Sequence, residues 1–318
     1  MNLKIIFLFT GLTVFLCSCV TSAADEDAAP RAPYVGQRTK IILDCDNSMG
    51  SFFWEVDDGL AIAYLLNKPE VELVGITTVF GNRTYDHKYT VRQLKEAGRT
   101  DIPLYKGAQG PNERPAEAAV FLAETAAEFP GEITIIAAGP LANLQAASEI
   151  DPGFFSNLKQ VVLMGGITGE LVFGKRTVAE LNLSADFEAS HALFNSGCPV
   201  TVMTAQFCLN APFYKEDLKK LDNFPAKWKR YLRNWLFTMK IGVGLDRFIL
   251  WDLVPVVYAV HPEYFIDRNM VLTSSPEDLK TGYLRFTDNG NGNRINVPEQ
   301  FRDRDAFYND LFAAWNGR

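Results

Sequence analysis

The segment Ile41-Ile42-Leu43-Asp44-Cys45-Asp46, followed after ten residues by Asp57-Asp58, decides the fold. A short apolar run that ends in alternating carboxylates predicts a buried strand of a parallel sheet, because open α/β folds bind their ligands at the carboxyl ends of such strands. Four acids near one strand end repel each other, and a hard cation such as calcium or magnesium relieves that repulsion. The alternative is that Asp57 and Asp58 only open the next helix, where Asp favours the first turn.

The composition indicates a globular protein with one large α/β domain. The chain has 318 residues, of which 47% are hydrophobic and 22% are charged, and such a chain can bury a substantial core. Its formal net charge is −7, so nothing in the charge balance favours binding to nucleic acid.

The first residues have the pattern of an export signal, which we expect to span residues 1–18. A short basic start precedes an apolar run from Ile5 to Leu16, which is too short to span a membrane. The sequence Leu16-Cys17-Ser18-Cys19 resembles a bacterial lipobox, which would leave Cys19 as a lipid-bearing first residue. Cleavage after Ala23 is the alternative. We expect an exported protein, periplasmic or membrane-anchored, with a flexible tether over residues 19–38 and a catalytic domain over residues 39–318.

Alternating strands and helices follow along this domain. Strands are expected at 40–43, 71–79, 102–105, 132–137, 158–164 and 199–203, separated by helical segments, which predicts a parallel sheet with right-handed crossovers. From residue 213 to residue 251 we expect long helices rich in aromatic residues. The carboxyl-terminal part predicts a strand at 270–273, a hairpin through Asn289-Gly290-Asn291-Gly292 and a closing helix at 305–315.

A set of short motifs occurs in the order found in the inosine-uridine-preferring nucleoside hydrolases, and the chain resembles that family from about Lys40 onward. The motifs are Asp44-Cys45-Asp46, Asp57-Asp58, Thr77-Thr78-Val79-Phe80-Gly81-Asn82, Gly139-Pro140-Leu141-Ala142-Asn143, Val161-Val162-Leu163-Met164-Gly165-Gly166, Ala179-Glu180-Leu181-Asn182 and Trp251-Asp252. The resemblance implies a Rossmann-like α/β fold with a mainly parallel central sheet flanked by helices. It also implies a calcium-dependent enzyme that cleaves ribonucleosides to ribose and free base, in a homo-oligomer of two or four subunits.

The resemblance further implies roles for individual residues. It assigns calcium to the side chains of Asp46, Asp58 and Asp252 and to the backbone carbonyl of Ala138, where relatives commonly carry Thr. It assigns Asp46 a second role, as general base on a metal-bound water. The residues that would contact the ribose are Asp57, Asn82, Glu180 and Asn182, with Met164 packed near the sugar.

The chemistry of this reaction fits such a set of acids. Cleavage of an N-glycosidic bond gives the ribose oxocarbenium character, so the site needs nearby negative charge, a positioned water and assistance for the leaving base. Calcium can bind the sugar diol and lower the pKa of water, and a carboxylate can then take the water's proton.

Two departures from the family bear on substrate choice. Relatives usually have three residues between the second Asp and the Asp pair, whereas residues 47–56 make a longer connection here, which is either a lid or base-stacking wall or a displaced surface bulge. Relatives that favour inosine and uridine carry His where this chain has Trp251. A Trp there resembles the purine-preferring branch, and stacking on a base is worth ~1–3 kcal/mol, so purine nucleosides are the expected substrates. The alternative is that Trp251 only packs in the core.

Other functions remain open at the level of the sequence. A catalytically altered protein of the same fold that binds ribose or nucleosides is the main alternative, suggested by the longer loop and the missing His. A phosphohydrolase of the haloacid dehalogenase type also places Asp-x-Asp after its first strand, but its paired late acids lie far from that motif.

Overall fold

Side chains of the first strand, β1 (Thr39–Cys45), enter two separate cores in alternation. The computed structural model describes residues 34–51, 54–80, 86–114 and 117–317. Ile41 and Leu43 belong to one buried cluster and Ile42 to the other, as expected for a strand whose successive side chains point to opposite faces. Since both faces are covered, β1 reads as a continuous apolar run, which is typical of a parallel sheet.

Nine strands of the described residues form one sheet in the order β13-β12-β14-β8-β5-β4-β1-β2-β3. The pairs from β14 through β3 are parallel, and β12 pairs antiparallel with both β13 and β14. The other strands of this sheet are β2 (Val71–Thr78), β3 (Leu104–Lys106), β4 (Thr134–Ala137), β5 (Gln160–Met164), β8 (Val200–Met203), β12 (Asn269–Leu272), β13 (Phe286–Thr287) and β14 (Arg294–Asn296). The mainly parallel α/β fold expected from the sequence is confirmed.

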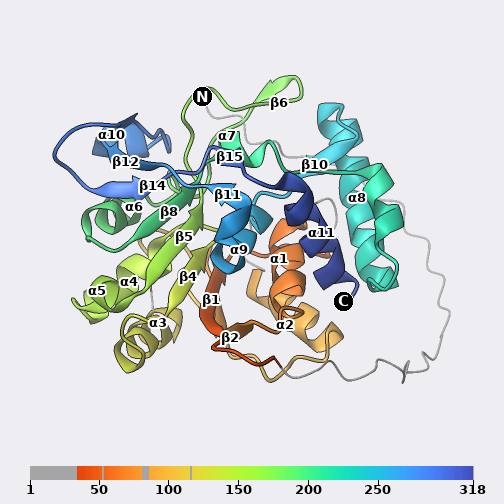
Figure 1. The fold of residues 1–318 in the computed structure, drawn as a ribbon, viewed down its shortest axis with the longest axis horizontal. Coiled ribbons are helices and arrows are strands. Elements are labelled where there is room, and N and C mark those ends of the chain that lie inside the picture. Colours follow the sequence, from red (N-terminus) through yellow and green to blue (C-terminus); the bar gives the residue numbers. More distant parts are fainter. Residues whose placement is uncertain (1–33, 52–53, 81–85, 115–116, 318) are drawn as a thin grey trace. The chain divides into compact units, whose positions relative to one another are not determined.

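Helices cover both faces of the sheet (Figure 1). One face carries α3 (Glu117–Glu128), α4 (Ala142–Ile150), α5 (Phe154–Asn157) and α6 (Phe187–Asn195), which pack against one another around the cluster that contains Ile42. The other face carries α1 (Asp57–Leu65), α9 (Leu253–Val260) and α11 (Arg304–Trp315). All nine residues of α1 are buried, so the start of this helix lies inside the protein.

The remaining elements complete the described part of the fold. They are α2 (Asp86–Glu96), α7 (Ala205–Cys208), α8 (Ala226–Val243), α10 (Pro276–Leu279), the 3-10 helices η1 (Lys215–Lys220) and η2 (Pro262–Tyr264), and the strands β6 (Val172–Phe173), β7 (Arg176–Thr177), β9 (Pro212–Tyr214), β10 (Arg247–Ile249), β11 (Phe265–Ile266) and β15 (Gln300–Phe301). No helix among the described residues combines the length and the apolar composition of a membrane span.

Two local expectations were wrong. The segment Asn289–Gly292 does not close a hairpin, because β13 and β14 on either side of it both pair with β12, which lies between them. The region from residue 213 to residue 251 contains one long helix, α8, with the antiparallel pair β9 and β10 around it. In both regions a strand pairs with a strand from which other elements separate it along the chain. Local signals for turns and helices do not reveal such pairings.

The part of the chain predicted to be an export signal lies outside the described residues, as does most of the predicted tether. The first strand begins at Thr39, where the sequence places the start of the catalytic domain.

Candidate active site

A cavity opens where β1, β4 and β5 end, and it contains most of the residues that the sequence singled out. The space between its walls, open mouth included, is about 960 Å³. Its lining consists of Asp46, Glu55, Asp57, Asp58, Ala138, Met164, Leu171, Phe173, Val178, Ala179, Glu180, Leu181, Asn182, Ala205, Trp235, Met239, Trp251 and Asp252. No Lys, Arg or His is among these residues. The lining is made mainly of carboxylates and of apolar or aromatic side chains.

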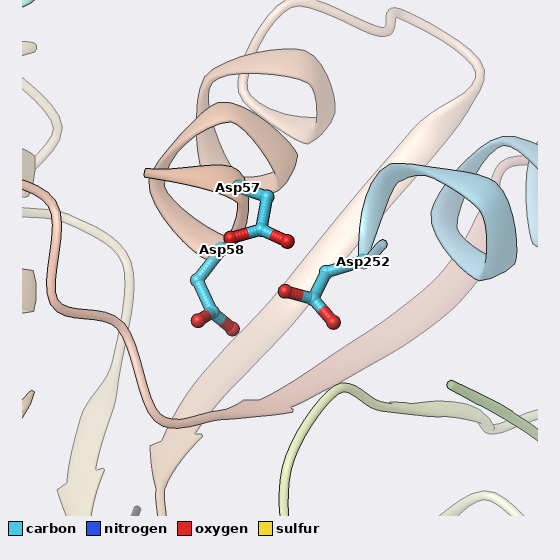
Figure 2. Close-up of side chains that lie close together, drawn as sticks. All are labelled: Asp57, Asp58 and Asp252. Carbon is cyan, nitrogen blue, oxygen red and sulfur yellow. The ribbon is translucent and has the colours of Figure 1, made fainter. Parts of the chain in front are cut away.

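Three buried carboxylates form the acidic centre (Figure 2). Asp57 and Asp58 are the first two residues of α1, and Asp252 directly precedes α9. Figure 2 shows their side chains pointing toward one another, and each offers an oxygen within 4.8 Å of the others. The starts of two buried helices therefore deliver three acids to one point, where the positive ends of the helix dipoles offset part of their charge.

The electrostatics of this triad show how crowded the carboxylates are. Burial raises the pKa of Asp57 to about 6, although hydrogen bonds with Asp252 and with the backbone of Trp251 lower it. Burial also raises the pKa of Asp252, and the charges of Asp57, Asp58, Asp46 and Glu55 raise it further. Without a cation, protons must therefore relieve part of the repulsion.

Helix capping does not account for these acids. Val56 occupies the cap position of α1, and the side chain of Asp252 makes no capping hydrogen bond to α9. Asp57 Oδ1 is buried and has no hydrogen-bond partner among the described residues. A buried, uncompensated carboxylate oxygen costs free energy unless it binds a cation or a ligand, so the triad fits a hard metal ion.

Asp46 and Ala138 lie beside the triad. Asp46 follows β1 and Ala138 follows β4, and both line the cavity. The Ala138 N–H donates to the backbone oxygen of Asp44, 2.8 Å away, which fixes the two strand ends together. A Cβ on Gly139 would lie only 3.3 Å from Asp46 Oδ1, so the Asp46 carboxylate packs against the backbone that follows Ala138. Their roles as metal ligands stay predictions.

Of the residues predicted to lie at the ribose, Asp57 belongs to the triad, and Met164, Glu180 and Asn182 line the cavity with it. Asn182 Nδ2 donates to Met164 O at 3.0 Å and lies 3.3 Å from Met164 Sδ, so these two residues form a unit. Glu180 is 7% exposed, and its carboxylate accepts bonds from backbone N–H groups. Asn82 lies outside the described residues, and its role stays a prediction.

The apolar side of the cavity contains more aromatic surface than the sequence predicted. The ring of Trp251 packs edge-on against Phe173, with centroids 5.9 Å apart. Trp235 and Met239 of α8 complete this wall, and they lie four residues apart on one helix face. Sequence reasoning expected an aromatic-rich region around Trp235 but gave no site role to Trp235, Phe173 or Met239. The signal in the sequence was the four-residue spacing of Trp235 and Met239, which places both side chains on one face of a helix.

The long connection after Asp46 is anchored, so the displaced-bulge alternative does not hold for its described residues. Asn47 is fully buried and donates to Thr90 Oγ1 and Gln93 Oε1 of α2, at 3.2 and 2.9 Å. Arg92 of α2 donates to the backbone oxygen of Met49 at 2.8 Å. The far end of the connection brings Glu55 to the cavity, a contribution that the sequence did not predict.

Comparison with known proteins identifies the family. The inosine-uridine preferring nucleoside hydrolases match residues 41–309 of this chain. The chain belongs to this family. A probable uridine nucleosidase 2 of Oryza sativa subsp. japonica is 29% identical over 283 residues, which cover 77% of this chain and 80% of that protein.

Solved structures of nucleoside hydrolases share the fold. A plant nucleoside hydrolase, the PpNRh1 enzyme, superposes with a TM-score of 0.76 at 24% identity, covering 88% of this chain and 99% of its own. A purine-preferring ribonucleoside hydrolase from Gardnerella vaginalis gives a TM-score of 0.75 at 22% identity, with 87% and 98% covered. The family thus includes members named for pyrimidine and for purine substrates.

Family membership settles the reaction class. The protein is a nucleoside hydrolase that cleaves ribonucleosides, and neither a phosphohydrolase nor a binding protein without turnover is favoured. Members of this family typically depend on calcium, and the buried triad of Asp57, Asp58 and Asp252 is a group that can hold such an ion.

Proposed function

We propose that the protein is an exported, calcium-dependent hydrolase that favours purine ribonucleosides. The observation that carries the proposal is one cavity with two unlike sides. The buried acidic triad suits a calcium ion and the positive charge that develops on the ribose, and the wall of Trp251, Phe173 and Trp235 suits a flat base.

In this mechanism Asp46, Asp58, Asp252 and the carbonyl of Ala138 would hold a calcium ion, which would supply positive charge to orient the ribose hydroxyls and to lower the pKa of water. Asp46 takes a proton from the water that attacks the anomeric carbon. The N-glycosidic bond breaks with its electron pair going to the base, which then takes up a proton from solvent. Asp57 and Asn182 hold the ribose hydroxyls, and the surrounding carboxylates stabilise the oxocarbenium character of the sugar.

Trp251 supports the purine preference. The indole lines the cavity and is held by Phe173, so its face can stack on the leaving base. A purine offers a larger face than a pyrimidine, and stacking makes its departure easier. Cleavage of uridine is the second candidate, since the relative from Oryza sativa is named as a probable uridine nucleosidase.

Sugar release from equal concentrations of inosine, adenosine, guanosine, uridine and cytidine tests the base preference. The proposal expects kcat/KM values for the three purine nucleosides about tenfold or more above those for the pyrimidines, which corresponds to one stacking interaction. A kcat/KM for uridine equal to that for inosine would overturn the purine preference and leave the hydrolase intact.

The proposal also covers location and assembly. The lipobox-like sequence ending at Cys19 supports a lipid anchor on an exported protein, with residues 19–38 as the tether. By analogy with the family, the enzyme is a homo-oligomer of two or four subunits. Light scattering of the eluting protein on a sizing column gives the subunit number, and a monomer would contradict this part of the proposal.

A further inference from the structure

The helix α8 has two unlike faces. Side chains at spacings of three or four residues form its buried face, namely Trp228, Leu232, Leu236 and Met239. On the opposite, outward face Phe237 and Ile241 are 57% and 68% exposed. Apart from Val35, close to the start of the described chain, no large apolar side chain of the described residues is more exposed. The outward face of α8 therefore leaves adjacent apolar side chains in water, which is typical of a contact surface when polar groups surround them.

The same face is basic. The 18 residues of α8 include five Lys and Arg residues and no Asp or Glu, in a chain whose formal net charge is −7. Arg230 and Arg233 are exposed, and their spacing places them on the side of Phe237. Neither arginine has an ion-pair partner within the described part of the chain. Lys240 pairs with Asp246 at 3.0 Å, but these side chains are 67% and 70% exposed, so the pair is weak and a stronger anion can replace it.

The surface of an anionic bilayer complements such a face. Arginine and lysine are attracted to anionic headgroups, while aromatic and aliphatic side chains enter the boundary between the headgroups and the acyl chains. A soluble polyanion would satisfy the arginines but would leave Phe237 and Ile241 in water. A second copy of this chain in a two-fold contact would bring Arg230 and Arg233 against their own copies, and like charges repel.

The position of α8 leaves its outward face accessible. Figure 1 shows α8 at the margin of the fold, where it packs on β10 and η1. Its inward side contributes Trp235 and Met239 to the cavity. Contact with a membrane on the outward face therefore leaves the lining of the cavity unchanged.

We propose that the outward face of α8, formed by Arg230, Arg233, Phe237, Lys240 and Ile241, docks on a membrane surface that carries anionic lipids. The inference goes beyond the proposed function, because it concerns neither the nucleoside nor the calcium ion. It does not require a lipid on the amino-terminal segment. In an anchored chain the tether would keep α8 close to the bilayer, so a modest affinity of this face is enough to orient the domain.

A fluorescent reporter on α8 tests the docking. The full chain carries Cys17→Ser and Cys19→Ser, which remove the proposed acylation site, and the other cysteines of the sequence are buried. Phe237→Cys then adds an exposed thiol for a dye whose emission depends on the polarity around it. Val120→Cys is the matched control, because Val120 is exposed on α3, which covers the opposite face of the sheet.

Vesicles of phosphatidylcholine that contain phosphatidylglycerol should shift the emission of the dye at position 237 to the blue. Vesicles of phosphatidylcholine alone should not, and the dye at position 120 should not respond to either. With Arg230→Gln and Arg233→Gln added, the lipid concentration that gives half of the shift should rise about tenfold or more, because two cations are lost. The melting temperature of the labelled proteins shows that each is folded.

Several results would overturn the proposal: no shift at position 237, an equal shift at both positions, an equal shift on phosphatidylcholine alone, or an unchanged response of the arginine variant. A blue shift that grows with protein concentration in the absence of vesicles would also overturn it, because a second copy of the chain would then cover the face. Absence of ribose release by the wild-type enzyme would instead contradict the proposed function, so the two failures are distinguishable.

Discussion

At the scale of single residues, Asp46 is the test of the proposed chemistry. Asp46→Asn keeps the size of the side chain but removes its ability to take a proton from water. We expect kcat to fall about 10²- to 10⁴-fold, which is the usual contribution of a general base. Asp288→Asn, at an exposed position, is the control. The melting temperature should be similar in both variants, and a fully active Asp46→Asn enzyme would refute the base assignment.

Trp251 carries the argument for purines. Trp251→Ala removes the ring that packs against Phe173, so the advantage of a large base should shrink. We expect the ratio of kcat/KM for inosine to that for uridine to fall about tenfold, equivalent to one base–aromatic stack. Uridine serves as the internal control in the same preparation. An unchanged ratio would mean that Trp251 only packs in the core.

The triad should make calcium affinity depend on pH. The pKa of Asp57 is raised to about 6 in the metal-free site, so this group holds a proton at pH values where an ordinary Asp is ionised. A calcium ion bound beside Asp57 favours the ionised carboxylate, so binding at acidic pH releases that proton, and the calcium affinity should weaken as pH falls from about 7 to about 5. Calorimetry in buffers of different ionisation enthalpy would show proton release. Binding that is independent of pH over this interval would disagree with the account.

At the scale of elements, the segment between Asp46 and α1 is a packed part of the site. Asn47→Ala would remove the two buried hydrogen bonds that Asn47 donates to Thr90 and Gln93 of α2, at a cost of about 1–3 kcal/mol in the free energy of unfolding. Thermal or denaturant unfolding measures this loss, with Asn289→Ala at an exposed position as the control. Equal stability of the two variants would show that the anchor contributes little.

The elements also show how far sequence reasoning reaches. The apolar run of β1 and the acids after it predicted the sheet edge, because both the burial of a strand and the charge at its end are local features. The aromatic wall of the cavity was harder to predict from the sequence. Phe173 and Trp235 line one cavity with Trp251 because of how α8 and the β6–β7 pair pack, which is not a local feature.

At the scale of the whole molecule, the amino-terminal segment predicts where the enzyme works. Expressed in a bacterium, the wild-type chain should incorporate labelled fatty acid, and Cys19→Ala should not. Cys17→Ala is the matched control, because it changes the neighbouring cysteine and leaves the modification site. Label that persists in Cys19→Ala, or that never appears in the wild type, would contradict the lipid anchor.

The central claim is that the buried acids hold a calcium ion on which ribonucleoside cleavage depends. The most direct measurement is a calcium titration of chelator-treated, folded enzyme, with ribose release from inosine as the readout and magnesium as the comparison. The account predicts that the treated enzyme is inactive and that activity returns in proportion to about one bound calcium per chain, with magnesium less effective because it demands a stricter geometry. Full activity of the metal-free enzyme would contradict it.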